Sequence, residues 1–283
     1  MSQATLKDNG TTNVVEALDV ALELSKSVWK LAMSDGRQGG RPRLVDVQAR
    51  DLGRLKRELE TGRKQLGLGE QAPIRSCYEA GRDGFWLHRA LTARGVDNLV
   101  VDAASIEVSR RRKNAKTDRL DAQKLVEQLI RHWRSEHVWS VVHVPSPEDE
   151  DLRHLHRELE LVKREARKHR TRLQSLLFAH GIDVKIRARF AEEVASFRGW
   201  DGQPLPVWLQ RRLMLGWERY QLACKQRLQL EKTRDAMVNG ADKNRRLNKV
   251  RMLSQLRGVG VQSGWLLVME SSDGRCRIDA YAL

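Results

Sequence analysis

The sequence has few cysteines and no long apolar run, and each absence excludes a class of protein. Three cysteines occur in 283 residues, and Cys77, Cys224 and Cys276 lie far apart. An odd and widely spaced set excludes a disulfide framework and a zinc-ligand spacing, and it favours a reducing cytosol. No apolar run approaches the ~20 residues of a membrane helix, and the polar N-terminus lacks a signal core. We therefore expect a cytoplasmic protein with no membrane partner.

Positive charge is in clear excess. The chain holds 52 lysines and arginines against 37 aspartates and glutamates, a net charge of +15. Basic side chains displace the counterions condensed on phosphates, so this excess predicts a polyanionic partner. The charge is clustered rather than spread, which favours nucleic acid over an incidentally basic surface. The length suggests two domains, or one domain with a helical extension.

The first half of the chain, residues 1–140, alternates strand-like and helix-like patterns. Strand patterns occupy residues 14–22, 27–34, 41–47, 74–80 and 98–103. Helical patterns occupy residues 49–67, 84–95 and 117–133. Strands first, followed by alternating strand and helix, predict an α/β domain whose sheet is covered by helices.

The second half carries a heptad repeat that begins near residue 145. One heptad position holds Leu152, Leu159, Ala166 and Leu173, and the position three residues later holds Leu155, Val162, His169 and Leu176. Four heptads predict a long helix in a coiled coil or a helical hairpin across residues 145–245. Packing within one chain remains an alternative to a contact between copies.

Later segments interrupt and resume this helical pattern. "GWDGQPLPVW" at 199–208 is expected to break the helix before a second helical stretch at 209–238. "LRGVGVQSGWLLVME" at 256–270 is expected to form a new apolar helix after a glycine turn, within a third region at 250–283. The tryptophans, including Trp29, Trp86, Trp133 and Trp139, are interpreted as core residues rather than platforms for base stacking.

Two aspartates three residues apart follow the most basic segment, in "RRRKNAKTDRLDAQKL" at 110–125. Asp118 and Asp121 share one helix face, so their carboxylates can converge. The alternative is structural: Asp118 caps the helix, and Asp121 interacts favourably with the helix dipole. This pair alone does not separate the two interpretations.

Two more acids fall on predicted strands. Asp19 shares a strand face with apolar neighbours, where a carboxylate is costly unless it is paired or binds a metal. Glu79 ends the strand pattern "IRSCYE". Either acid alone could simply lie at an exposed strand end. Taken with Asp118 and Asp121, they form the set of oxygen ligands that a two-magnesium phosphoryl-transfer site requires.

Three stretches, "LDVAL", "YEAGRDGFWLHRAL" and "RRKNAKTDRLDAQKL", resemble the DEDD transposases of the insertion-sequence one-ten family, relatives of the Piv DNA invertases. The resemblance runs from about residue 14 to 270, and "KTDRLDA" is its most specific part. It implies a RuvC-like domain with an RNase H type fold, whose four Mg²⁺-binding catalytic acids match Asp19, Glu79, Asp118 and Asp121. The basic residues beside them are expected to bind the nucleic-acid backbone: Arg110, Arg111, Arg112, Lys113, Lys116 and Arg119.

The resemblance also implies partners and an activity. A long coiled coil assembles a homo-oligomer, and a C-terminal domain supplies a catalytic serine. A structured non-coding RNA guides the enzyme to donor and target DNA. The expected function is that of a DNA transposase that cleaves and exchanges strands. A RuvC-like junction-resolving nuclease and an inactive nucleic-acid-binding remnant are the alternatives, and the coiled coil and "LRGVG" favour the transposase.

The last residues depart from the family pattern. Relatives continue past "LLVME" with a pattern resembling Phe-Phe-Gly-Trp-Arg, whereas here "SSDGRCRIDAYAL" follows Glu270. Reading TTC TTC GGA TGG one base late encodes Ser-Ser-Asp-Gly, so a frameshift after Glu270 is expected, with a short variant or a deliberately cut chain as alternatives. Neither Ser271 nor Ser272 is interpreted as the nucleophile. We expect a truncated, defective chain whose apolar helix at 256–270 lacks cover.

Overall fold

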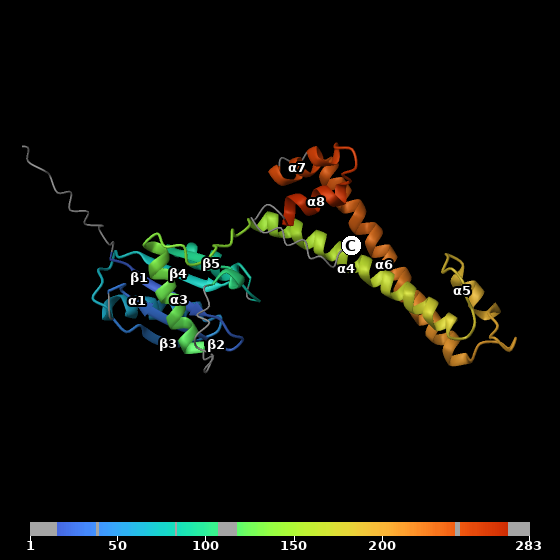
Figure 1. Ribbon diagram of the computed structural model, residues 1–283, viewed down its shortest axis with the longest axis horizontal. Helices are drawn as coiled ribbons and strands as arrows, with labels where there is room; N and C mark the ends of the chain where they lie inside the picture. The colour runs from blue at the N-terminus through green and yellow to red at the C-terminus, as the bar shows by residue number, and fades with distance from the viewer. Residues whose placement is uncertain (1–15, 38–39, 83, 107–117, 241–243, 271–283) are drawn as a thin grey trace, which may run out of the picture. The chain divides into compact units, whose positions relative to one another are not determined.

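The computed structural model describes residues 16–37, 40–82, 84–106, 118–240 and 244–270 (Figure 1). The chain divides into two compact units, one ending at Val144 and the other beginning at Pro145. Among the described residues, no helix has the length and apolar character needed to cross a membrane.

A five-stranded sheet with the strand order β3-β2-β1-β4-β5 forms the centre of the first unit. Its strands are β1 (Leu18–Glu23), β2 (Val28–Ser34), β3 (Arg43–Gln48), β4 (Ile74–Glu79) and β5 (Val96–Val101). The first three strands pair antiparallel, while β4 runs parallel to β1 and to β5. The mixed α/β class predicted from the sequence is confirmed.

Alternate residues of each strand point to opposite faces of this sheet. Leu18, Val20 and Leu22 of β1 lie in the apolar cluster under α1 (Leu52–Gln65) and α2 (Trp86–Thr92). Ala21 faces the other way, into a second cluster with residues of α3 (Asp118–Trp133), which crosses the strands in Figure 1. By the same alternation Asp19 and Glu23 belong to the face that α3 covers.

The long helix α4 (Pro147–Phe178) opens the second unit, and the local sequence explains where it begins. The Ser146 hydroxyl accepts a hydrogen bond of 3.1 Å from the backbone N–H of Asp149. Proline at the first helical position loses no intrahelical hydrogen bond, and the acidic residues of the first turn interact favourably with the helix dipole.

Replacing Ser146 by alanine is expected to lower the free energy of unfolding by about 1 kcal/mol, because the N–H of Asp149 loses its partner. Thermal or urea unfolding of the purified protein measures this change. Ser175→Ala, an exposed serine inside the same helix, is the matched control and should change the stability by far less. Equal effects of the two substitutions would contradict the capping role.

A helical hairpin forms when α6 (Val207–Asn239) packs antiparallel along α4. The four residues of the first heptad position are buried inside the same chain: Leu152, Leu159, Ala166 and Leu173. Gly216 lets the helices approach closely, since a Cβ at this position would lie 2.9 Å from Cδ2 of Leu173. This repeat is therefore satisfied by packing within one chain, and assembly through it stays a prediction.

The first helix of the hairpin ends earlier than the sequence suggested. It stops at Phe178, whereas the expected break lay at 199–208. Gly181 has a φ of 79°, which favours glycine, and the N–H of Ile182 donates to the carbonyl of Leu177 at 3.1 Å. The N–H of Gly181 donates to Phe178 O, completing a Schellman motif. The short helix α5 (Phe190–Glu193) follows and packs into the apolar cluster at this end.

The other end of the hairpin is covered by two short helices, α7 (Arg245–Ser254) and α8 (Val261–Glu270). The sequence patterns did not predict α7. Trp265 and Met269 of α8 are fully buried against residues of α7 and α4, and Arg153 donates a 2.9 Å hydrogen bond to the carbonyl of Met269. The expectation that this apolar helix lacks cover is therefore wrong for Trp265 and Met269, whereas Leu266 and Leu267 remain 39% and 44% exposed.

Candidate functional site

Two glutamates end neighbouring parallel strands at the same edge of the sheet. The strand sequences are LDVALE for β1 and IRSCYE for β4, and Leu22 lies opposite Tyr78. The next step in this register places Glu23 beside Glu79, on strands about 4.8 Å apart. Both side chains line a cavity of about 390 Å³, together with Lys26 and Arg82. Carboxyl ends of parallel strands are common positions for ligand sites in α/β proteins.

The N-terminal turn of α3 lies toward this edge. Sγ of Cys77 is 3.9 Å from the carbonyl of Leu125, which fixes the level at which helix and sheet meet. Two strand residues from Cys77 to Glu79 span about 7 Å, and four helix residues from Leu125 back to Asp121 span about 6 Å. Asp121 therefore lies level with Glu79 along the strand direction.

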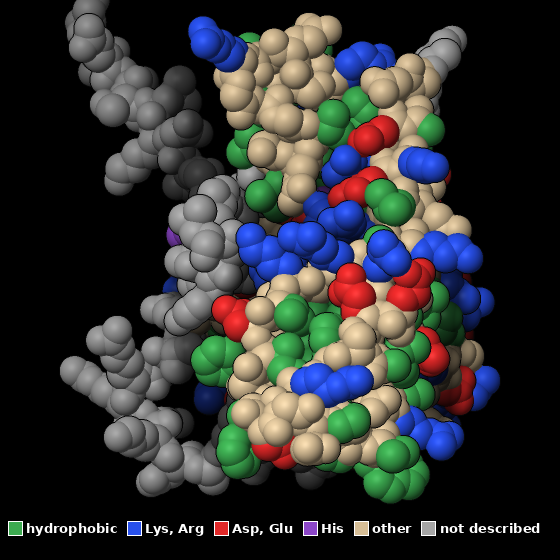
Figure 2. Space-filling view, turned by 90° about the vertical axis from the view of Figure 1, so that its right-hand side faces the viewer, with side chains coloured by type: hydrophobic (Ala, Val, Ile, Leu, Met, Phe, Trp, Pro, Cys, Tyr) green, Lys and Arg blue, Asp and Glu red, His purple; other side chains and the backbone are tan. Residues whose placement is uncertain are grey.

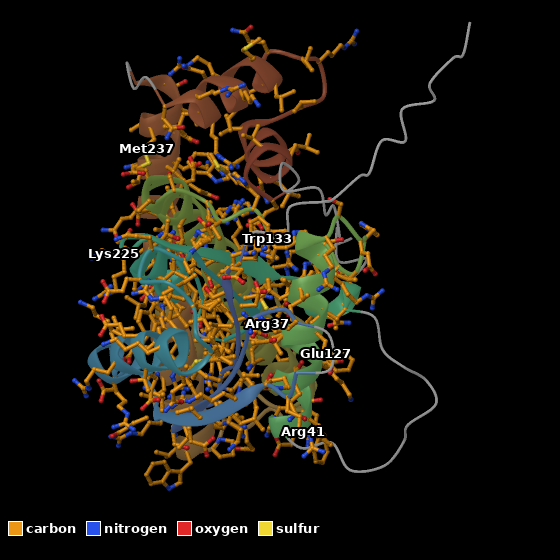
Figure 3. All side chains as sticks on the ribbon, turned by 90° about the vertical axis from the view of Figure 1, so that its left-hand side faces the viewer. Arg37, Arg41, Glu127, Trp133, Lys225 and Met237 are labelled. Carbon is orange, nitrogen blue, oxygen red and sulfur yellow. The ribbon has the colours of Figure 1, made fainter. Side chains whose placement is uncertain are left out.

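The opposite end of α3 confirms this direction. The Arg75 guanidinium lies 5.0 Å from the centre of the Trp133 ring, and Trp133, labelled in Figure 3, is the last residue of α3. Arg134 donates a 2.7 Å hydrogen bond to the carbonyl of Gly36, just after β2. The helix thus runs opposite to β1 and β4, and its positive dipole end points toward Glu23 and Glu79.

The structure does not bring Asp19 to these acids. Asp19 pairs with Arg75, four residues before Glu79, so about 13 Å along the strand separates the levels of the two acids. Its ion-pair partner is Arg75, whose Nε lies 3.5 Å from Oδ1 of Asp19. The register therefore places Asp19 and Glu79 toward opposite ends of their paired strands, and the role of Asp19 as a metal ligand stays a prediction.

Burial governs the chemistry of Asp19. The residue is 4% exposed, and its Oδ1 finds no hydrogen-bond partner among the described residues. Burial raises the pKa of this carboxyl to about 6, although the charges of Arg75 and Arg134 act in the opposite direction. Asp35 adds a smaller like-charge effect that raises the pKa further. Asp19 is thus a buried carboxyl with a raised pKa and an arginine beside it.

Glu23 is the acid that the sequence patterns did not single out. It shares the strand face of Asp19, because four residues separate the two along β1. In the structure β1 and β4 each end on a glutamate, whereas the strand patterns read from the sequence, 14–22 and 74–80, ended on Leu22 and Ala80 and gave no such signal. Strand periodicity places Asp19 and Glu23 on the same face of the sheet, but it does not say which of the two lies beside Glu79.

Comparison with known proteins identifies the family. No protein-family model matches the chain. Over 281 residues the chain is 34% identical to a Sinorhizobium fredii protein named "Putative transposase y4rJ", with 94% of this chain and 71% of that protein covered. The chain belongs to this transposase family. A transposase acts on DNA, which agrees with the net charge of +15.

Part of the predicted site of this transposase lies outside the described residues. This applies to Arg110, Arg111, Arg112, Lys113 and Lys116, and to the side chains of Asp118 and Arg119. In the part of the chain that is described, no group of three or more His, Cys, Asp and Glu side chains could hold a metal ion.

The donor set that is described still suits one kind of metal. Mg²⁺ is usually bound through one or two carboxylates, several waters and the phosphates of a substrate. Glu23 and Glu79 supply two carboxylates at one cavity, and Asp121 lies level with them. Lys26 and Arg82 on the same cavity can contact a phosphate. The residues at this edge therefore fit a hydrated Mg²⁺ ion that meets a DNA phosphate.

Proposed function

We propose that this transposase cleaves DNA phosphodiester bonds with Mg²⁺ held by Glu23, Glu79, Asp118 and Asp121. One observation carries the proposal: Glu23 and Glu79 line a single cavity at the carboxyl edge of the sheet. Bound there, Mg²⁺ would neutralise charge on the phosphate and activate the attacking oxygen. The set keeps three of the four acids expected from the sequence and replaces Asp19 by Glu23.

In this proposal the acidic residues around the cavity bind the metal ion, and the basic residues bind the DNA substrate. Adjacent carboxylates of like charge repel each other, and a bound divalent cation relieves that repulsion. Lys26 and Arg82 line the same cavity and attract the DNA backbone, so phosphate and metal can be held together. The dipole of α3 adds positive potential from the side of Asp121.

The finer features of the family resemblance belong to the same proposal. The mixed sheet, with three antiparallel strands followed by parallel β4 and β5, is compatible with a RuvC-like domain of RNase H type. A non-coding RNA is proposed as the guide, and a homo-oligomer as the working form. The name of the relative supports transposition over a junction-resolving nuclease or an inactive remnant.

Cleavage of DNA that carries the ends of the element tests the activity. Strand scission by the purified transposase should require Mg²⁺ or Mn²⁺ and disappear when a chelator is added. Cleavage that continues at full rate in the chelator would contradict a metal-dependent site.

The basic segment gives a second test, through the salt dependence of binding. Replacing Arg110, Arg111, Arg112 and Lys113 by glutamine should weaken DNA and RNA binding. It should also reduce the slope of log K against log salt by about 0.9 for each duplex phosphate that no longer meets a cation. A salt titration by fluorescence anisotropy measures the slope. The matched control replaces four exposed cations of α1: Arg54, Lys56, Arg57 and Lys64. An unchanged slope in the first variant would remove this segment from the interface.

A further inference from the structure

The far end of the α4–α6 hairpin exposes large aromatic side chains. Trp200, Trp208 and Phe178 are 88%, 76% and 71% exposed. By contrast, Trp217 and Trp265 in the same unit are 5% and 0% exposed. The interpretation of the tryptophans as core residues is therefore wrong for Trp200 and Trp208, and Trp133 of the first unit is also 41% exposed. Indole rings that leave this much apolar area in water mark a surface for contact with a partner.

The backbone presents Trp200 in a defined position. Gly199 donates a 2.9 Å hydrogen bond to the carbonyl of Gln203, and the N–H of Gln203 donates to Oδ1 of Asp201. This turn rests against the end of α4, since a Cβ on Gly181 would lie 3.3 Å from Cβ of Trp200. The turn is thus held on both sides while the indole ring itself remains in solvent.

Trp208 is held by the hairpin as well. It lies in the first turn of α6, where the Arg211 guanidinium is 5.6 Å from the centre of its ring. A guanidinium near an indole face is an attractive cation–π contact, and it leaves the opposite face of the ring available. Two exposed indole rings therefore stand at one end of the hairpin.

The charge around these rings favours one class of partner. Residues 163–225, the outer half of the hairpin, hold 14 lysines and arginines against six aspartates and glutamates, a net charge of +8, and residues 178–212 at its tip hold six against four. All of these cations except Lys163 are exposed. Figure 2, seen from the side of α5, shows basic side chains on this face together with acidic and apolar ones. Cations interleaved with exposed aromatic rings are the pattern that binds single-stranded nucleic acid, by stacking and phosphate contact.

We propose that the tip of the hairpin binds an unpaired nucleic-acid strand by stacking bases on Trp200 and Trp208. Arg198, Arg211 and Arg212, all exposed at this end, contact the phosphates. The bases of a duplex already stack on each other, so the indole rings favour unpaired strands, whose bases are free to stack on them. The proposal rests on the proposed function only in that the partner is nucleic acid, and it needs no metal.

Equilibrium binding of the full chain to labelled oligonucleotides tests this surface. Single-stranded DNA, single-stranded RNA and a duplex of the same sequence are compared in a chelator, so the metal site has no part in the result. Trp200→Ala and Trp208→Ala should each weaken binding of a single strand by about tenfold, because base stacking on an aromatic ring is removed. Duplex binding should change by less than about twofold, since the cations remain.

Two matched variants make the test specific. Leu222→Ala removes an exposed apolar side chain from the shaft of α6 and should leave every affinity unchanged. Trp200→Phe keeps an aromatic face and should retain most of the affinity that Trp200→Ala removes. Preferential weakening with DNA or with RNA supports the proposal and identifies the strand. Equal weakening for duplex and single strands, or unchanged single-strand affinity in a folded Trp200→Ala protein, overturns it.

Discussion

Glu23→Gln and Glu79→Gln are each expected to abolish metal-dependent DNA cleavage and to weaken Mn²⁺ binding by about 100-fold or more. Loss of an outer partner of a metal ligand already costs about 10- to 100-fold in affinity, and the loss of a ligand costs at least as much. Both glutamates line one cavity, so the two variants should lose DNA cleavage and Mn²⁺ affinity to a similar extent. Calorimetric titration with Mn²⁺ measures the affinity, and nicking of supercoiled DNA measures the chemistry.

Two control variants separate this site from other acids. Glu60→Gln changes an exposed glutamate of α1, on the other side of the sheet, and should affect neither measurement. Asp19→Asn should also retain metal binding, because Asp19 lies beside Arg75 rather than Glu79. The opposite pattern, in which Asp19→Asn loses Mn²⁺ and Glu23→Gln keeps it, would restore the acids chosen from the sequence.

Asp19→Asn is expected to stabilise the protein at neutral pH. Burial raises the pKa of Asp19 from 3.8 to about 6 in the folded protein. Between these two values the folded protein retains a proton that the unfolded chain has released, so stability falls as the pH rises. Each pKa unit corresponds to about 1.4 kcal/mol, so the ionised carboxyl costs the folded protein about 3 kcal/mol above pH 6. An asparagine at this position does not ionise, so it makes no contribution to the pH dependence of the stability.

Urea unfolding at several pH values from about 4 to 7.5 measures the effect. The stability of the variant relative to the natural protein should grow through this window and become constant above pH 6. Asp46→Asn, an exposed partner of Lys30, is the control and should show a much smaller dependence. A stability difference that is the same at both ends of the window would refute the buried-carboxyl account.

Much of the fold was readable from the sequence because it depends on local periodicity. The strand patterns, α1 and α3, and the long helices of the hairpin were all expected close to where they occur. The helix α7 was missed, and α4 was expected to be longer than it is. Its end depends on the left-handed conformation of Gly181, which a heptad pattern does not report. The cover over Trp265 likewise comes from distant residues of α4 and α7.

The sequence by itself predicted the α/β class, the long helices of the second unit, an excess of positive charge suited to a polyanionic partner, and Glu79 and Asp121 as candidate acids. Only the tertiary structure showed that Glu23, rather than Asp19, lies at the level of Glu79, because residues four apart on a strand share a face and differ only in the end of the sheet at which they lie. It also decided that the heptad leucines pack within one chain and that Trp200 and Trp208 remain in solvent. Periodicity reports which side chains share a face, whereas burial depends on which distant segment packs against that face.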